Sequence, residues 1–135
     1  IEAAIVASEG TIIAVEHDKA SQAAMEANVE KFGVHNIEIV PDMSPSSLST
    51  LPTPRLAFIV ATKNLEQHIQ NLLALNPNMQ FVIYTLELDI LSGIKALFEK
   101  YHIRNMEVLQ ITVSKLDSKS VFVTQPSPWL ISGEA

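Results

Sequence analysis

The chain of 135 residues lacks cysteine altogether and has little glycine. Without cysteine there is no disulfide and no thiolate metal site, and a reducing cytoplasm is the environment that suits such a chain. Its four glycines are isolated from one another, so there is neither a glycine-rich phosphate loop nor the Gly-x-Ser-x-Gly elbow of serine hydrolases. The sequence therefore does not support a nucleotide triphosphatase or a serine hydrolase.

Charge is also limited, and its balance is negative. Charged residues make up 18% of the chain, and the formal net charge is −6. An acidic domain repels phosphate backbones, so we expect no nucleic-acid partner. Apolar runs such as residues 56–61 are far shorter than the roughly 20 residues of a membrane span, so we expect no membrane partner. The histidines are not spaced as a helical metal pair, so we expect no metal centre.

The first third of the chain alternates helix and strand. The alanine-rich run Ile1–Ser8 is typical of the end of a helix, and we expect Gly10 to end it in the left-handed conformation. Thr11–Val15, with its β-branched side chains, is typical of a buried strand. Asp18 can then cap a helix that ends at Gly33.

The alternation continues and then breaks. Strands are expected at Ile37–Val40, Leu56–Ala61 and Phe81–Tyr84, and a loop at Pro41–Pro54 with a helical turn near Ser46–Ser49. A helix is expected from near Lys63, with its apolar stripe at Leu65, Ile69 and Leu72. A second helix is expected with its apolar stripe at Ile90, Ile94, Leu97 and Tyr101. Met106–Val113 and Val121–Thr124 are too close together for a helix between them. They predict an antiparallel hairpin, after which Trp129–Ile131 resumes the ladder.

Serial strand–helix units predict an α/β fold with a parallel sheet and helices on both faces. Apolar residues make up 47% of the chain, so we expect one core and a single domain over residues 1–135. A C-terminal antiparallel hairpin is the arrangement of class I methyltransferases. Because ligands of such sheets bind beyond the carboxyl ends of the strands, the candidate site comprises Glu16, His17, Asp18, Asp42, Met43, Ala61, Thr62, Tyr84 and Thr85.

Several blocks of the sequence resemble a known family. They are Gly10–Asp18, Asn28–Val34, Asn36–Val40, Leu51–Pro54 before the strand Leu56–Val60, Thr85–Glu87, and the ending from Pro128 to Gly133. In this order they resemble the precorrin-6Y C(5,15)-methyltransferases of cobalamin biosynthesis, and in particular their decarboxylating, C-terminal-type domain. The resemblance covers nearly the whole chain, and the first block is its most specific part.

The resemblance implies an enzyme that uses S-adenosylmethionine to methylate a precorrin tetrapyrrole and to decarboxylate one of its acetate side chains. It implies cofactor contacts from Glu16, on the ribose hydroxyls, and from His17, Asp42, Met43 and Val60. It implies substrate contacts from Ala61, Thr62 and Thr85, and it suggests a homo-oligomer. No catalytic acid or base is indicated.

The chain departs from the family pattern in three places. The first strand and its glycine-rich loop are missing, so we expect a domain truncated at its N-terminus. Val60-Ala61 replaces a glycine pair, and apolar residues around Val82-Ile83 replace an asparagine–alanine pair. These departures leave open a non-catalytic binding or oligomerisation module of the same fold. A fragment of an NAD-type dehydrogenase is a third interpretation, against which the terminal hairpin argues.

Simpler roles also remain open for single residues. Glu16 can be an exposed acid at the end of a strand that helps the next helix to begin. Asp42 after Pro41 suits a turn, and Thr62 suits the cap of the helix expected from Lys63.

Overall fold

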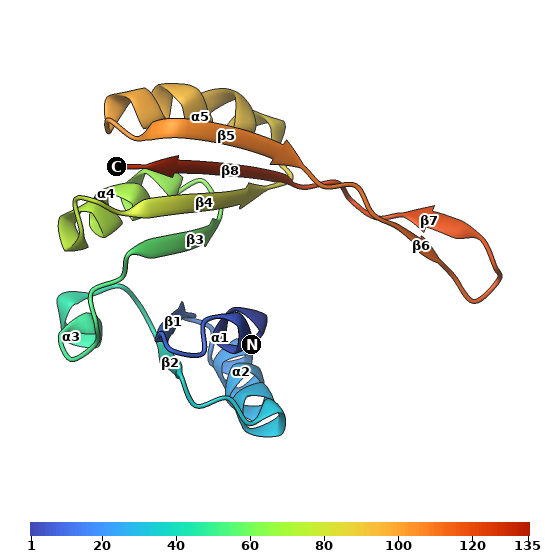
Figure 1. The fold of residues 1–135 in the computed structure, drawn as a ribbon, viewed down its shortest axis with the longest axis horizontal. Coiled ribbons are helices and arrows are strands. Elements are labelled where there is room, and N and C mark those ends of the chain that lie inside the picture. Colours follow the sequence, from blue (N-terminus) through green and yellow to red (C-terminus); the bar gives the residue numbers. More distant parts are fainter. The chain divides into compact units, whose positions relative to one another are not determined.

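A computed structural model describes all 135 residues and divides them into two compact units, Ile1–Thr53 and Pro54–Ala135 (Figure 1). Each unit contains its own sheet, and each is described separately below. Whether the two units form the single domain expected from the composition stays a prediction. None of the helices is both long enough and apolar enough to cross a bilayer.

The first unit is a two-stranded parallel sheet with three helices. Its elements are α1 (Glu2–Val6), β1 (Ile12–Val15), α2 (Lys19–Phe32), β2 (Ile37–Val40) and α3 (Pro45–Leu48). β1 pairs with β2 from Ile12 opposite Ile37 to Val15 opposite Val40. The side-chain amide of Asn36 donates to the carbonyl oxygens of Ala4, Ala7 and Gly10, each at 3.0 Å. One polar side chain therefore fixes the end of α1 to the start of β2.

The caps of α2 follow the sequence closely. Asp18 is its N-cap and accepts from the Ser21 backbone N–H, and Gly33 ends it at φ 63°. Both predictions for this helix are confirmed. The prediction for Gly10 is wrong, because Gly33 is the only glycine with positive φ. The residue that ends α1 is Ala7, and Gly10 lies beyond it in a turn that its N–H closes on the Ala7 carbonyl at 2.9 Å.

The second unit is a four-stranded sheet with a hairpin extension. Its elements are β3 (Leu56–Val60), α4 (Leu65–Leu75), β4 (Gln80–Thr85), α5 (Leu88–Lys100), β5 (Arg104–Gln110), β6 (Ser114–Leu116), β7 (Phe122–Thr124) and β8 (Trp129–Glu134). The strand order is β3-β4-β8-β5, with β3 parallel to β4 and β8 antiparallel to both neighbours. The late strand β8 is thus inserted between two earlier ones (Figure 1).

Strand pleating separates the two faces of this sheet. Residues of one face are buried with the apolar stripes of α4 and α5, namely Ala57, Ile59, Phe81, Ile83 and Ile131 of the strands with Leu65, Ile69, Leu72, Ile94 and Phe98 of the helices. Gly133 of β8 lies where a Cβ atom would come within 2.6 Å of the Phe98 ring and 2.7 Å of Ile103 Cγ2. A side chain at this position would therefore force Phe98 or Ile103 to shift.

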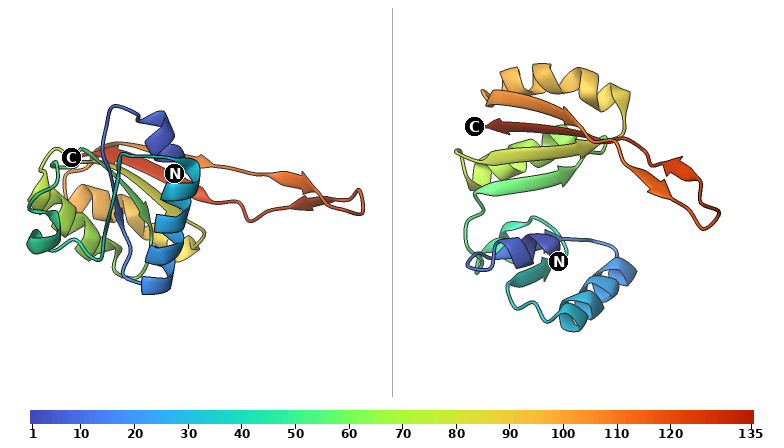
Figure 2. Two further views of the ribbon diagram at one scale, coloured as in Figure 1. Left: turned by 90° about the horizontal axis from the view of Figure 1, so that it is seen from below. Right: turned by 45° about the vertical axis from the view of Figure 1, so that its right-hand side comes forward.

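β6 and β7 form a two-stranded arm that extends away from the four-stranded sheet (Figure 2). The predicted hairpin is confirmed at its tip, where Leu116 pairs with Phe122. The prediction that Met106–Val113 pairs with Val121–Thr124 is wrong over most of its length. The residues up to Gln110 belong to β5 and pair with β8, because β8 follows the arm in the sequence and returns to the four-stranded sheet.

Candidate functional site

In the first unit, the carboxyl edge of the sheet brings two of the predicted acids to the same side. Glu16 directly follows β1, and its backbone N–H donates to the Val40 carbonyl at the end of β2 at 3.0 Å. Asp42 lies two residues beyond Val40. Because the strands are parallel and in register, both acids follow the same edge, as the sequence predicts.

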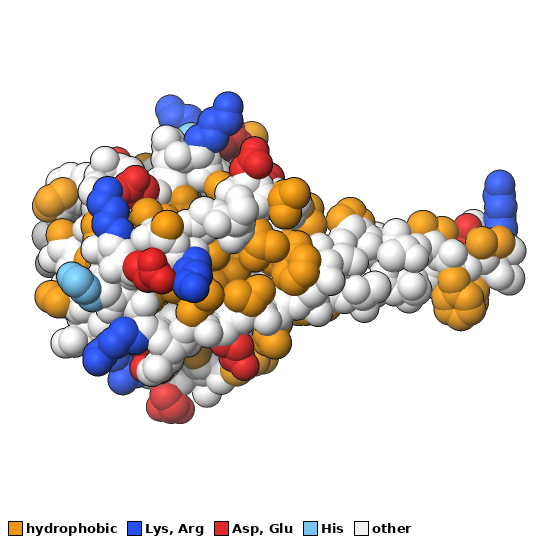
Figure 3. Space-filling model, turned by 90° about the horizontal axis from the view of Figure 1, so that it is seen from above, with side chains coloured by type: hydrophobic (Ala, Val, Ile, Leu, Met, Phe, Trp, Pro, Cys, Tyr) orange, Lys and Arg blue, Asp and Glu red, His pale blue; other side chains and the backbone are white.

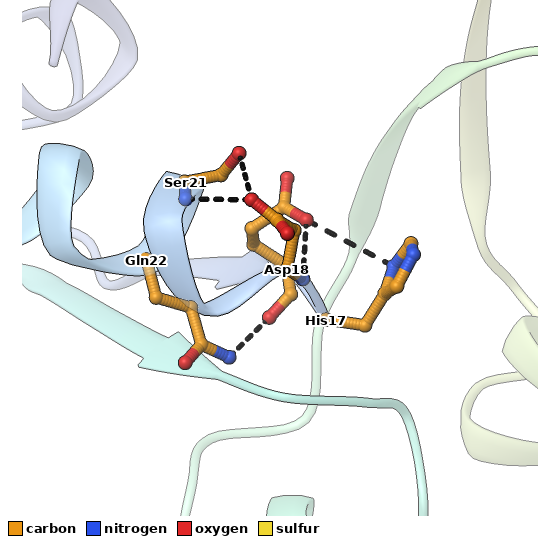
Figure 4. Close-up of polar contacts among 5 residues, drawn as sticks. His17, Asp18, Ser21 and Gln22 are labelled. Carbon is orange, nitrogen blue, oxygen red and sulfur yellow. Dashed lines mark hydrogen bonds and ion pairs between the residues drawn. The ribbon is translucent and has the colours of Figure 1, made fainter.

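The Glu16 carboxylate is held in place and remains partly available. Its Oε1 accepts from the Asp18 backbone N–H at 2.9 Å, and its main-chain carbonyl accepts from the Gln22 side chain (Figure 4). The side chain is 29% exposed. No donor of the protein contacts Oε2. An oriented carboxylate with one unoccupied oxygen can accept a hydrogen bond from a ligand hydroxyl.

His17 is placed beside this carboxylate by a weak contact. Its Nδ1 lies 3.8 Å from Glu16 Oε1, and its side chain is 94% exposed (Figure 4). An exposed pair of this length contributes little in water. His17 is therefore held only weakly by the protein, and a cofactor contact from it stays a prediction.

Asp18 and Asp42 use their carboxylates locally. Asp18 accepts from the backbone N–H and the hydroxyl of Ser21, both at 2.8 Å, and these bonds lower the pKa of Asp18. Asp42 accepts from the Ser44 N–H at 2.9 Å and the Ser47 hydroxyl at 2.7 Å. Hydrogen bonds from Ser44 and then Ser47 lower the pKa of Asp42. Asp42 thus organises the turn that leads into α3.

Met43 lies half-buried between Asp42 and the α3 N-cap Ser44. Met43 is therefore part of the turn that the Asp42 carboxylate organises. An adenine contact from this position stays a prediction.

In the second unit, Val60 and Ala61 face opposite ways at the end of β3. Val60 is 61% exposed, whereas Ala61 is 7% exposed and its N–H donates to the Tyr84 carbonyl at 2.9 Å. Thr62 is exposed, and its hydroxyl accepts from the Asn64 N–H at 3.4 Å. The N-cap of α4 is Asn64 and the helix begins at Leu65, close to the expected start near Lys63, so the cap is Asn64 and not Thr62.

Thr85 is buried, at 2% exposure, at the end of β4. Its hydroxyl accepts from the Glu87 N–H at 2.9 Å, directly before α5. The side chain therefore shapes the β4–α5 connection, and a direct substrate contact from it stays a prediction.

Two aromatic residues lie near this edge, of which Tyr84 was among the predicted site residues and Phe58 was not. Phe58 and Tyr84 lie on the sheet face opposite the helices, with ring centroids 6.5 Å apart and Val60 opposite Tyr84. Phe58 is 61% exposed. The sequence shows Leu56–Ala61 as a continuous apolar run, which conceals the alternation between a buried and an exposed face.

Comparison with known proteins identifies the family. The family model described as a precorrin methyltransferase domain matches residues 1–123 and so spans both units. This chain belongs to the precorrin methyltransferase domain family. The family resemblance predicted from the sequence blocks is confirmed, and no curated protein matches the chain.

Solved structures similar to this precorrin methyltransferase domain share its class I fold. Precorrin-6Y C5,15-methyltransferase from Geobacter metallireducens is 24% identical with a TM-score of 0.84, over 98% of this chain and 70% of that one. Precorrin-8w decarboxylase from Methanobacterium thermoautotrophicum is 15% identical with a TM-score of 0.72, over 93% and 70%. A SAM-dependent O-methyltransferase from Thermotoga maritima is 14% identical with a TM-score of 0.71, over 96% and 52%. The predicted fold class is therefore confirmed.

Proposed function

We propose that this precorrin methyltransferase domain transfers a methyl group from S-adenosylmethionine to a precorrin of the 6Y type and promotes loss of an acetate carboxyl group. The family supports the methyl transfer, and the names of similar structures, a precorrin-6Y methyltransferase and a precorrin-8w decarboxylase, support both steps. The observation that carries the proposal in this chain is the oriented carboxylate of Glu16 with its free oxygen.

The residues at the carboxyl edge of β1–β2 fit the nucleoside part of S-adenosylmethionine. Glu16 would accept from a ribose hydroxyl, and Met43 and Asp42 would border the adenine, with His17 at the margin. When bound, the cofactor supplies an electrophilic methyl group. The protein's own contribution is to orient cofactor and substrate, since alignment alone can supply much of the rate.

We infer that the substrate-facing residues are Val60, Ala61, Thr62 and Thr85, with Val60 also reaching the cofactor. Val60 and its neighbours Phe58 and Tyr84 offer an apolar surface, which suits a flat macrocycle. An apolar surrounding also disfavours a carboxylate and so favours its loss as carbon dioxide. Thr85 would act through the loop that its hydroxyl holds.

A non-catalytic module of the same fold is the second candidate. It is favoured by the side chains of Val60 and Ala61, which narrow the space beside the sheet edge compared with a glycine pair. We further infer a cytoplasmic homo-oligomer, from the family resemblance and the absence of cysteine. We also propose that the residues 1–135 act as one domain, because the family model crosses both units.

Calorimetric titration with S-adenosylmethionine and its demethylated product tests the cofactor site. Glu16→Gln is expected to weaken binding by about tenfold to a hundredfold, since a charge-assisted hydrogen bond is lost. Glu38→Gln is the matched control, because Glu38 is an exposed acid in the middle of β2. Transfer of a labelled methyl group to the precorrin then separates the two candidates. Binding without transfer would favour the non-catalytic module, and a folded chain that binds neither compound contradicts the cofactor site.

A further inference from the structure

A glutamine outside the predicted site holds the chain on both sides of His17. Gln22 is half-buried near the start of α2, and its side-chain amide donates to the main-chain carbonyl of Glu16 (Figure 4). The backbone N–H of Gln22 donates to the Asp18 carbonyl at 2.9 Å. One residue of α2 therefore fixes the turn that leads from β1 into this helix.

The polar groups of Glu16 are bonded within the protein except for one carboxylate oxygen. Its N–H donates to the Val40 carbonyl at 3.0 Å, and its main-chain carbonyl accepts from Gln22. Its Oε1 accepts from the Asp18 N–H at 2.9 Å. Two of these bonds join backbone groups or a backbone N–H that any residue would supply. The bond from Gln22 is the one that depends on a second side chain.

The bond from Gln22 also controls the neighbouring bond to the carboxylate. A peptide unit is planar, so fixing the Glu16 carbonyl fixes the orientation of the unit that joins Glu16 to His17. The Asp18 N–H that holds Oε1 belongs to the next peptide unit. Without the Gln22 donor the turn can rotate, and the Glu16 carboxylate moves with it.

The position of Gln22 in the helix explains how its side chain reaches Glu16. Asp18 is the N-cap of α2, so Gln22 lies one turn after the cap. Side chains of a helix point toward its N-terminus, and the long side chain of Gln22 therefore passes back over the cap. Its amide donates without adding a charge beside the Glu16 carboxylate.

Recognition of a ligand at Glu16 depends on such local contacts. Acidic and basic side chains are interspersed on the face of the molecule that Figure 3 shows. At 0.1 M salt, exposed charges are screened beyond about 10 Å, so charge spread in this way does not orient a ligand. A hydrogen bond weakens steeply as its angle departs from linear. The direction of the Glu16 carboxylate therefore decides how well it accepts from a hydroxyl.

We propose that Gln22 is a positioning residue for the cofactor, a role that rests on the proposed function. Through the main-chain carbonyl of Glu16, it directs the Glu16 carboxylate toward the ribose hydroxyls of S-adenosylmethionine. Gln22 itself does not contact the ligand in this arrangement, so its effect on binding passes through Glu16.

A double-mutant cycle tests this dependence by calorimetric titration with S-adenosylmethionine. Gln22→Met keeps the length of the side chain and removes the donor, and it should raise the Kd about threefold to tenfold. In a Glu16→Ala chain there is no carboxylate to direct, so the same substitution should change the Kd less than about twofold. Gln67→Met is the matched control and should leave the Kd unchanged, since the Gln67 amide bonds only to Asn71 within α4.

Stability separates positioning from a purely structural role. Glu16→Ala keeps the main-chain carbonyl, so Gln22→Met should lower the urea midpoint equally in both backgrounds. Hydrogen exchange of the unliganded chain adds a direct readout. In Gln22→Met the Asp18 N–H, which is bonded to Glu16, should exchange faster, whereas the Ser21 N–H, which is bonded to the Asp18 carboxylate, should stay protected.

The outcomes distinguish this role from the proposed function. Equal losses of affinity in the two backgrounds, or an Asp18 N–H that stays protected in Gln22→Met, would overturn the role of Gln22. Binding that Glu16→Ala weakens and Gln22→Met does not would overturn that role alone. A folded wild-type chain that does not bind S-adenosylmethionine would contradict the proposed function, and the role of Gln22 with it.

Discussion

The two units of the chain are stabilised in different ways. In Ile1–Thr53 the buried apolar residues are Ala4 and Val40, and α2 buries no residue at all. In Pro54–Ala135 both helices and every strand of the four-stranded sheet except β5 contribute buried apolar residues. The first unit depends instead on polar contacts at turns and caps, from Asn36, Asp18 and Asp42. The predicted cofactor contacts lie mainly in this unit, so its order should depend more on what it binds.

Truncation of a phenylalanine in each unit gives the largest expected contrast. Phe81→Ala should lower the free energy of unfolding by about 3–5 kcal/mol, because Phe81 is 1% exposed and its removal leaves a cavity. Phe32→Ala, at a residue that is 57% exposed, should change it by about 0.5 kcal/mol. Urea denaturation measures both. Equal losses would show that Phe32 is packed as tightly as Phe81.

Binding of the cofactor should reduce the difference in stability between the two units. At a hundredfold excess over Kd, S-adenosylmethionine should stabilise the chain by about 2.7 kcal/mol. The gain in amide protection should concentrate in β1, β2 and the Glu16 N–H, which is bonded to Val40. Hydrogen exchange with and without the cofactor measures this. Protection that rises only in α4 and α5 would contradict the placement of the site.

Two glycines of the second unit test how closely it is packed. Gly133→Ala should destabilise the chain by about 1–3 kcal/mol, because its Cβ would meet Phe98 and Ile103 below 3 Å. Gly93→Ala is the control, since a Cβ there meets nothing within 4 Å and lies inside α5. The free energy of unfolding of the Gly93→Ala variant should rise by about 0.5–1 kcal/mol. Thermal unfolding of both variants decides whether the core is rigid at β8.

The smallest effect expected concerns acid stability of the first unit. The pKa of Asp18 is lowered in the folded state, chiefly by the Ser21 N–H. The Asp18 carboxylate therefore adds to the free energy of unfolding at pH values above its pKa in the unfolded chain. This stabilisation is lost as the pH falls through its pKa in the folded chain. Asp18→Asn keeps an N-cap acceptor but removes this titration. Its melting temperature should fall less between neutral and acidic pH than that of the wild type, and equal slopes would contradict this.

The sequence was sufficient for features fixed within a few residues of one another. Asp18 and Gly33 mark the ends of α2 by their chemistry alone, and the spacing of Leu65, Ile69 and Leu72 marks the buried face of α4. The edge position of Glu16 and Asp42 was also predictable, because it follows from parallel strands in register.

Features that depend on distant partners were not predictable. The expectation that Trp129–Ile131 resumes the antiparallel ladder is confirmed by its pairing with β5. Nothing local indicates that β8 also pairs with β4, since this order is decided by pairing across the sheet. The same applies to Thr85, whose burial depends on neighbours that the β4 segment does not reveal. Phe58 was missed because the continuous apolar run Leu56–Ala61 does not show which residues face outward.

The central position of β8 has a consequence for how the protein is made on the ribosome. β4 and β5 are both synthesised before the strand that joins them, so the nascent sheet has a gap between its second and fourth positions. Until Trp129–Glu134 emerges, both flanking strands expose unpaired edges, which is when aggregation is easiest. The charged arm residues Lys115, Asp117 and Lys119 are translated within this interval, and like other charges near exposed strands they can protect the nascent chain from nonspecific pairing.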